Sequence, residues 1–372
     1  MDDRLDPRFT AALRSALLDE VRTAPAAPPA RVAPSAPRRP RWQPVLALGI
    51  AAVTIVAIAI GFSVAAQTRS SAPAAVPFDG DCAAILTAHQ ATALIGKPLT
   101  LRPATSPLDS PETLAVRTVG GLDCTWSGDG DAADESGVDL TVLPVALRPT
   151  GAQAEARYFG SNEGKDLQYT CPVDVVAGGR WVAGFLTGLT GGSQARAVTA
   201  VASLRTTVDA LPAATASAAL DTDGWWSPIG CAALGTRADL ASALGRRDLT
   251  TGDGDGGMRS AGQGAAVDRA AVVNCLLQAA TDAQHPFGAE VHAIAGAGAV
   301  VTERMQGSDV HRLADVDGAK VYLVADTVAT TSALWVVADG GALELLPSNG
   351  DARTLLPAVA PILKTLDAHV RK

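Results

Sequence analysis

The sequence predicts an α+β protein: one transmembrane helix followed by two tandem domains, each an antiparallel sheet with helices packed on one face. Three observations support this prediction: a long uncharged apolar segment, an internal duplication, and the same order of helix and strand patterns in both copies. The expected parts are a cytoplasmic tail (1–44), a transmembrane helix (45–66), a linker (67–77), a first domain (78–211), a second linker (212–223) and a second domain (224–372).

The apolar segment 45–66 contains 22 residues, none of them charged. As a helix it is about 33 Å long, which is enough to cross a hydrocarbon core of about 30 Å. Four arginines precede it closely, namely Arg31, Arg38, Arg39 and Arg41, whereas only Arg69 follows it before Lys97. Because basic residues stay on the cytoplasmic side, the sequence predicts a single-pass cell-membrane protein with its N-terminus inside and its large C-terminal part in the cell envelope.

A cleaved signal peptide is the alternative interpretation of this segment, and Ser63-Val64-Ala65 resembles a cleavage site. The apolar run is longer than the roughly 7 to 15 residues of a signal peptide, and a long organised segment precedes it. No lipid-attachment motif precedes Cys82. A retained anchor is therefore the preferred prediction.

The N-terminal segment has two parts. Asp6-Pro7 is a predicted helix start, and Phe9, Leu13, Leu17 and Val21 recur at the spacing of one amphipathic helical face. Such a helix could contact a cytosolic protein, or it could be a loosely structured tail, since a lone helix of this length is marginal in water. Residues 23–44 contain seven prolines and predict an extended spacer.

The composition of the chain limits its partners. Its net charge is −8 and its aromatic content is 4%. An acidic outer part does not favour nucleic acid as a partner. Hydrophobic residues make up 48% of the chain but aromatic residues only 4%, so alanine and valine must supply most of the core.

The outer part contains two copies of one unit. The segment CAAILTAHQATALIG at 82–96 returns as CAALGTRADLASALG at 231–245, and AVASLRTTVDA at 200–210 returns as AVAPILKTLDA at 358–368. Between these matches Cys124 corresponds to Cys275, and Trp181 to Trp335. Two units indicate a tandem pair of domains rather than a solenoid.

The same secondary structure is predicted in both copies. Each should open with a helix (82–95 and 231–244) that ends at a glycine, and should close with a longer amphipathic helix (194–211 and 351–370). A small helix is possible at 151–159 and at 297–305. The strand-like runs between them are 138–147 and 168–186, with one around Cys124, in the first copy, and 270–280, 289–295, 320–326 and 334–346 in the second.

All five cysteines follow the apolar segment, which fits an oxidising exterior. Fifteen arrangements of two disulfides are possible, and the duplication selects Cys82–Cys124 with Cys231–Cys275. Cys171 has no counterpart in the second copy. It is either a buried thiol, which we favour, or a reactive or intermolecular one.

No catalytic, cofactor-binding or metal-binding motif is evident. The five histidines lack metal-ligand spacing, and Gly191-Gly192-Ser193-Gln194-Ala195 lacks the final glycine of a nucleophile elbow. We expect neither an enzyme nor a cofactor; a deep pocket with paired acids or with an acid–histidine pair would reverse that expectation.

Two further features allow alternative interpretations. Two acidic loops could bind calcium; one contains Asp129, Asp131, Asp134 and Glu135, and the other contains Asp253 and Asp255. Both depart from the EF-hand pattern, so solvated surface turns are the favoured interpretation. Trp225-Trp226 could form a binding surface, although packing is the favoured interpretation.

The pattern C-A-A-[IL]…A-L-x-G, followed by a strand that carries Cys124-Thr125-Trp126, resembles small cell-envelope domains of actinobacterial proteins, many of them lipoproteins. The resemblance covers both copies and implies a structural disulfide in each. The second copy departs from the pattern, because Leu276 follows Cys275. High alanine content and the preference for arginine over lysine fit a GC-rich source.

These features together predict a membrane-anchored extracytoplasmic binding module whose partner is an envelope protein, a peptide or a wall component. The alternative is a transmembrane sensor or regulatory protein whose N-terminal helix contacts a cytosolic partner.

Overall fold

The computed structural model of the chain describes twelve segments, all within the unit formed by residues 66–372. They are 76–102, 110–128, 136–150, 159–160, 169–189, 193–213, 220–234, 237–254, 259–279, 287–306, 309–325 and 332–372. The predicted amphipathic helix and the apolar segment 45–66 lie outside these segments. The possible small helix at 151–159 also lies outside them, except for Phe159, which begins a strand. None of the helices described combines the length and the apolar character that crossing a bilayer requires.

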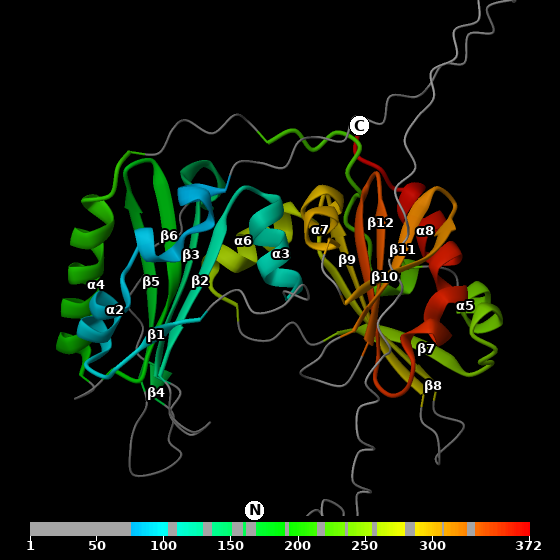
Figure 1. The fold of residues 1–372 in the computed structure, drawn as a ribbon, viewed down its shortest axis with the longest axis horizontal. Coiled ribbons are helices and arrows are strands. Elements are labelled where there is room, and N and C mark those ends of the chain that lie inside the picture. The colour runs from blue at the N-terminus through cyan, green and yellow to red at the C-terminus, as the bar shows by residue number, and fades with distance from the viewer. Residues whose placement is uncertain are drawn as a thin grey trace, which may run out of the picture. The chain divides into compact units, whose positions relative to one another are not determined.

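The first copy forms an antiparallel sheet with the strand order β1-β2-β3-β6-β5-β4 (Figure 1). Its strands are β1 (Thr100–Leu101), β2 (Leu122–Ser127), β3 (Gly137–Pro144), β4 (Phe159–Gly160), β5 (Tyr169–Ala177) and β6 (Arg180–Thr187). The predicted run 168–186 is a hairpin of β5 and β6, which turns at Gly178 and Gly179 with positive φ angles of 56° and 79°.

The second copy forms a second antiparallel sheet with the order β10-β11-β12-β13-β9-β8-β7. Its strands are β7 (Leu249–Asp253), β8 (Val273–Ala279), β9 (Phe287–Ala295), β10 (Val310–Val316), β11 (Ala319–Ala325), β12 (Ser332–Ala338) and β13 (Gly341–Pro347). Two antiparallel sheets with helices confirm the α+β class and are consistent with two domains.

The second sheet has the same strand order as the first when it is listed from its other edge, as β7-β8-β9-β13-β12-β11-β10. In this alignment β6 corresponds to β13, and β5 corresponds to β12. This correspondence corrects one sequence match. Trp181 is the second residue of β6, which pairs with β3, whereas Trp335 lies in β12, which pairs with β11 and β13. The two tryptophans are therefore not equivalent, although both are fully buried.

The opening helix of each copy is shorter than predicted. In the first copy a 3-10 turn (Cys82–Ala84) precedes α2 (Ala88–Ile95), which starts with a capping box between Thr87 and Gln90 and ends at Gly96 with φ 87°. In the second copy a turn (Cys231–Ala233) precedes α5 (Arg237–Ala243). In the first copy, the capping box of Thr87 and Gln90 starts a new helix after the cysteine, which explains the break there.

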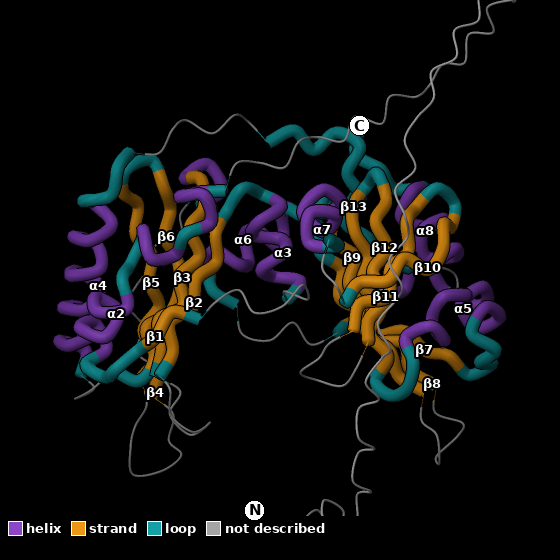
Figure 2. Tube along the Cα trace, in the orientation of Figure 1, coloured by secondary structure: helices purple, strands orange, loops and turns teal. Residues whose placement is uncertain are grey.

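The closing helices cover the same outer face of each sheet as the opening helices (Figure 2). They are α4 (Gln194–Asp209) in the first copy, and a 3-10 helix (Ala352–Ala358) followed by α8 (Val359–Asp367) in the second. Pro357 removes a backbone donor at the point where the predicted continuous helix is divided. The predicted small helix at 297–305 is α7 (Gly298–Arg304).

Two further helices were not predicted, and they change the architecture. Helix α3 (Pro111–Thr118) precedes β2, and α6 (Ala261–Arg269) precedes β8 at the equivalent place in the second copy. Helix α6 packs on β3 and β6 of the first sheet, while α3 packs on β9 of the second sheet. The prediction that helices cover only one face of each sheet is therefore wrong, because α3, α6 and α7 cover the inner faces (Figure 1).

The buried apolar side chains of the described residues form three clusters. Two of these clusters each lie within one copy, between its sheet and its outer helices. The third contains residues of both copies, among them Leu114 and Trp181 from the first and Ile294 and Trp335 from the second. The two copies thus share a core layer and are not joined by a linker alone.

Candidate functional site: a polar junction between the two copies

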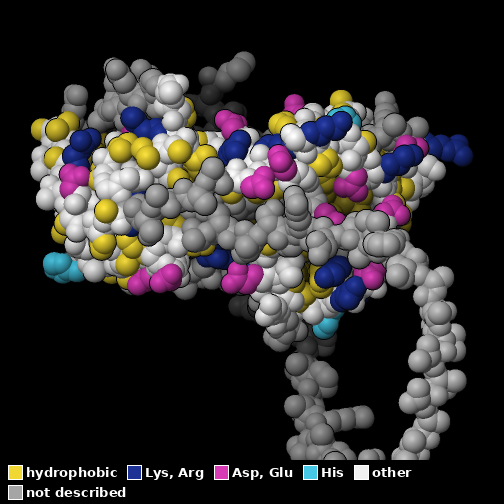
Figure 3. All heavy atoms as spheres, turned by 90° about the horizontal axis from the view of Figure 1, so that it is seen from above, with side chains coloured by type: hydrophobic (Ala, Val, Ile, Leu, Met, Phe, Trp, Pro, Cys, Tyr) yellow, Lys and Arg dark blue, Asp and Glu magenta, His cyan; other side chains and the backbone are white. Residues whose placement is uncertain are grey.

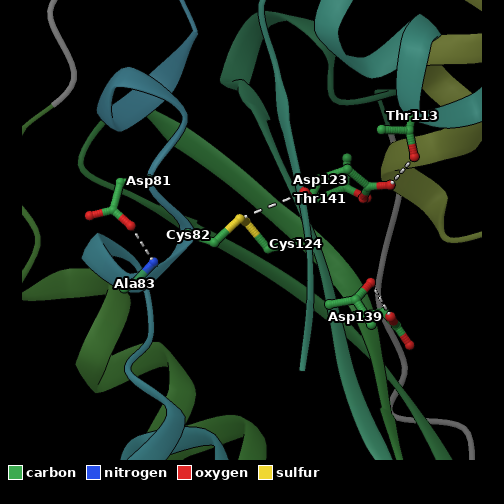
Figure 4. The surroundings of a disulfide bond; sticks show 9 residues. Asp81, Cys82, Ala83, Thr113, Asp123, Cys124, Asp139 and Thr141 are labelled. Carbon is green, nitrogen blue, oxygen red and sulfur yellow. Dashed lines mark hydrogen bonds between the residues drawn. A yellow bond between two sulfur atoms is a disulfide. The ribbon is translucent and has the colours of Figure 1, made fainter. Parts of the chain in front are cut away.

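The carboxylate of Asp123 is the centre of a hydrogen-bond network within the shared layer. It accepts hydrogen bonds from Thr113 Oγ1 at 3.0 Å, Thr141 Oγ1 at 2.8 Å and Gln263 Nε2 at 3.1 Å. Figure 4 shows Thr113 and Thr141 beside Asp123, whose neighbour Cys124 is disulfide-bonded to Cys82 on the other side of the sheet. Because Gln263 belongs to α6, this network joins the second copy to the first.

The start of α6 is fitted closely to the first sheet. Ser260 caps this helix by accepting a hydrogen bond from the backbone N–H of Gln263, and its hydroxyl lies 3.2 Å from Thr141 Oγ1. A Cβ atom at Gly262 would lie 3.0 Å from the Thr141 side chain and 3.2 Å from that of Ala183. A glycine at this position therefore allows the helix to approach the sheet closely.

An ion pair between Glu112 and Arg259 connects the starts of the two inner helices. Arg259 donates from Nε and Nη2 to Glu112 Oε1, at 3.1 and 2.9 Å. The side chains are only 26% and 18% exposed for Arg259 and Glu112. Partial burial shields the pair from solvent, so it contributes more to orientation than a surface pair does.

The second copy contains a buried acid–histidine pair on its inner face. His292 of β9 and Glu344 of β13 are directly opposite in the strand register, with His292 Nδ1 2.8 Å from Glu344 Oε2. Their side chains are 6% and 4% exposed. The other ring nitrogen of His292 lies 3.5 Å from Glu290, whose side chain is 50% exposed.

The chemistry available to this pair is proton exchange. Burial raises the pKa of Glu344, the His292 hydrogen bond and charge lower it, and the nearby carboxylates of Glu290 and Glu112 raise it further, so the net direction is upward. A nucleophile would have to sit beside the free nitrogen of His292, and the side chain found there is a carboxylate. The acid–histidine pair therefore does not have the geometry of a nucleophilic triad.

A second acid with a perturbed pKa lies in the first copy. Burial raises the pKa of Asp139, the hydrogen bond from Thr125 opposes this effect, and the charge of Asp123 adds to it. Figure 4 includes Asp139 on β3 beside the strand that carries Asp123. Both inner faces thus contain a carboxyl group that holds its proton more tightly than usual.

The duplication relates the polar residues on the inner face of the first sheet to those on the inner face of the second. Cys124 is paired in register with Leu140, and Cys275 with Val291. The same register then places Asn274 opposite His292, as Asp123 is opposite Thr141. The inner-face polar positions of the first copy thus recur in the second with different side chains.

The cysteines have the arrangement that the duplication indicates. Disulfides join Cys82 to Cys124 and Cys231 to Cys275, with Cα–Cα distances of 5.7 and 5.5 Å. Cys171 is a free, fully buried thiol on β5, and burial raises its pKa. Each disulfide connects the outer opening segment of its copy to the strand next to one edge of its sheet, β2 or β8.

The other singled-out residues do not converge on one site. His89, His311 and His369 are exposed, and His285 lies outside the described residues, as do Asp255 and the acidic loop 129–135. Asp253 ends β7. In the described segments no group of three or more His, Cys, Asp or Glu side chains is placed to hold a metal ion.

Trp225 and Trp226 pack within the second copy. They are 5% and 1% exposed, and Trp226 Nε1 donates a hydrogen bond to Asp367 at 2.9 Å. The backbone approaches both rings closely: a Cβ at Gly296 would lie 2.2 Å from Trp225, and one at Gly340 would lie 2.3 Å from Trp226. This is the packing role favoured from the sequence.

Sequence reasoning missed the junction, although a signal for it was present. His292 interrupts the run AEVHAIA, and Glu344 interrupts ALELL. An ionisable residue within a largely apolar strand must find a partner when it is buried. Comparison of the chain with protein-family models, with curated proteins and with solved structures finds no match in any of the three.

Proposed function

We propose that the chain is a single-pass membrane protein whose residues 78–372 form a binding module in the cell envelope. Two disulfides, one in each copy, support an oxidising compartment, where such bonds persist. The uncharged segment 45–66 and the arginines before it support an anchor with its N-terminus in the cytoplasm.

The observation that carries the binding function is the shared layer of inner helices. Helices α3 and α6 contact each other and are packed into one apolar cluster with residues of both sheets. The two copies therefore present one composite outer surface to a partner. Acidic and basic side chains are interspersed on the face drawn in Figure 3, which favours a protein, peptide or wall component over a polyanion.

Crosslinking in intact cells tests this function. Photoreactive residues are placed at four exposed large apolar side chains within the described segments, Val145, Val176, Val198 and Val370. Specific adducts with one envelope component are the expected result, and exposed Thr206 is the matched control position. Absence of any specific adduct from all four positions contradicts a binding module.

A topology experiment tests the location separately. An alkaline phosphatase fused to the C-terminus should be active, because this reporter needs export and oxidation. A reporter that is active only when it is cytosolic contradicts the proposed orientation. Release of the mature polypeptide into the medium, beginning near Gln67, contradicts the retained anchor.

The second candidate function is a transmembrane sensor. The apolar stripe Phe9, Leu13, Leu17 and Val21 favours it, because such a helix needs a partner to be stable. Deletion of residues 1–30 separates the two functions: a sensor loses its cytosolic response, whereas a binding module keeps its adducts and its cellular effect unchanged.

A further inference from the structure

The residues Glu290, His292 and Glu344 form a chain from solvent to the buried inner face. Glu290 is half exposed and lies 3.5 Å from His292 Nε2, while His292 Nδ1 lies 2.8 Å from the buried Glu344 carboxylate. Imidazole can accept a proton at one nitrogen while it releases another. A buried carboxyl group at the end of this chain is therefore able to exchange protons with solvent without unfolding of the sheet.

This chain ends where the two copies meet. Helix α3 of the first copy packs on β9, which carries His292, and the charge of Glu112 in that helix acts on Glu344. When Glu344 is ionised, its buried negative charge faces a second carboxylate from the other copy. When Glu344 is protonated, this repulsion and the cost of burying its charge are both removed.

We propose that the Glu290–His292–Glu344 chain makes the packing of the two copies sensitive to pH, so that the junction is tighter in acid and loosens as the pH rises. This pH sensitivity depends on the junction alone and does not require a particular binding partner.

Several elements packed around His292 and Glu344 carry charged or titratable side chains. Helix α3 carries Glu112 and Arg117, and Arg259 just before α6 is paired with Glu112. Helix α7, which packs on β12 and β13, carries the exposed Glu303 and the half-buried Arg304. Within the register of the sheet, Glu344 is opposite Trp335 on one side and His292 on the other, and Trp335 is in turn opposite Tyr322 of β11.

The sign of the pH effect follows from the raised pKa of Glu344. The packed state holds this proton more tightly than a state in which water reaches the carboxyl group, because burial, the largest cause, raises the pKa from its ordinary value of 4.5. Packing is therefore favoured by proton binding, and it weakens as the pH rises from about 4.5 through the raised pKa of the packed state. One linked proton changes the opening constant by at most about tenfold per pH unit.

Hydrogen exchange of the full chain in detergent micelles, followed by mass spectrometry at pH 5, 6, 7 and 8, tests the proposal. Protection factors are corrected for the intrinsic exchange rate at each pH. Peptides that cover α3 and α6 should lose up to about tenfold protection per pH unit, whereas α4 on the outer face should not. Parallel loss in α4 overturns the proposal, because it indicates global unfolding.

Substitutions assign the effect to the pair. Glu344→Gln keeps an acceptor for His292 and has no charge to gain, so protection of α3 and α6 should become independent of pH. The matched control is Glu303→Gln, which should keep the wild-type dependence because Glu303 is exposed. A wild-type pH dependence in Glu344→Gln, or its loss in Glu303→Gln, overturns the proposal.

If Glu344→Gln does not fold, a second variant tests the same proposal. Glu290→Gln lies at a half-exposed position and removes one negative charge beside the pair. It should lower the pKa of Glu344 in the packed state and move the upper end of the pH-dependent range to lower pH. An unchanged range in this variant contradicts the proposal.

Discussion

Asp123 and Gln263 belong to different copies of the repeated unit, and the side-chain amide of Gln263 donates a hydrogen bond of 3.1 Å to the carboxylate of Asp123. This contact connects strand β2 of the first sheet to helix α6 of the second copy. The same carboxylate also accepts hydrogen bonds from Thr113 and Thr141. The junction thus combines apolar packing with a polar network that fixes its register.

The Asp123–Gln263 contact should appear as an energetic coupling. We expect Gln263→Ala to lower the free energy of unfolding by about 1 kcal/mol, and Asp123→Ala by about 2 kcal/mol or more, because the latter leaves several donors without their acceptor. Chemical denaturation of both single variants and the double variant should give a coupling energy of about 1 kcal/mol. The control is Asp123→Ala combined with Thr206→Ala at an exposed position. Strict additivity of the Asp123 and Gln263 changes would contradict the contact.

Two glycines of α6 offer a matched test of the close helix–sheet approach. A Cβ at Gly264 meets nothing within 4 Å, whereas one at Gly262 meets Thr141 and Ala183 at 3.0 and 3.2 Å. Gly264→Ala should stabilise the protein by about 0.5 to 1 kcal/mol through helix propensity. Gly262→Leu should destabilise it by about 1 to 3 kcal/mol through overpacking, and Gly264→Leu should not.

Thermal unfolding of these four proteins, wild type included, measures the difference. Equal effects of leucine at the two positions would mean that α6 does not pack on β3 and β6 as described.

The two disulfides should stabilise their copies to a similar extent. The sequence separations of the bonded cysteines are 42 and 44 residues, which predict about 4 kcal/mol for each bond from loop closure. Replacing Cys82 and Cys124 together, or Cys231 and Cys275 together, by serine should lower stability by that order under non-reducing conditions. Cys171→Ala is the control that keeps both bonds, and its Tm should respond to reductant as the wild type does.

Cys171 should be unreactive in the folded protein. It is fully buried and burial raises its pKa, so the thiolate fraction near pH 8 is smaller than for an exposed cysteine. A thiol reagent should modify no cysteine in the native chain and one after denaturation without reductant. Rapid modification of the native chain, located to Cys171 by mass spectrometry, would contradict its burial.

Much of the fold could be predicted because it depends on local patterns. The strand-like runs, the closing helices and α7 follow hydrophobic periodicity, and the glycine after the first opening helix adopts the expected left-handed conformation. The position of Trp335 could not be found in this way. Its match to Trp181 rested on similar letters, whereas strand pairing in three dimensions places Trp335 one strand further from the centre of the sheet.

The inner helices were missed for a physical reason. Helices α3 and α6 contain only eight and nine residues, and they start with serine caps that also occur in turns. Residues of α3 are buried on several sides at once, with Leu114, Ala115, Val116 and Thr118 all inaccessible, so no amphipathic stripe is visible. Their burial depends on the other copy, which no local window of the sequence contains.

Proteolytic cleavage between the two repeats should not separate them, because the shared core layer holds them together. The backbone connection between residues 213 and 220 is a covalent link in addition to the contacts of α3 and α6. Proteolysis there should leave two fragments that stay associated under native conditions and migrate separately only after denaturation, so an intact module and a nicked one would be indistinguishable by native size alone.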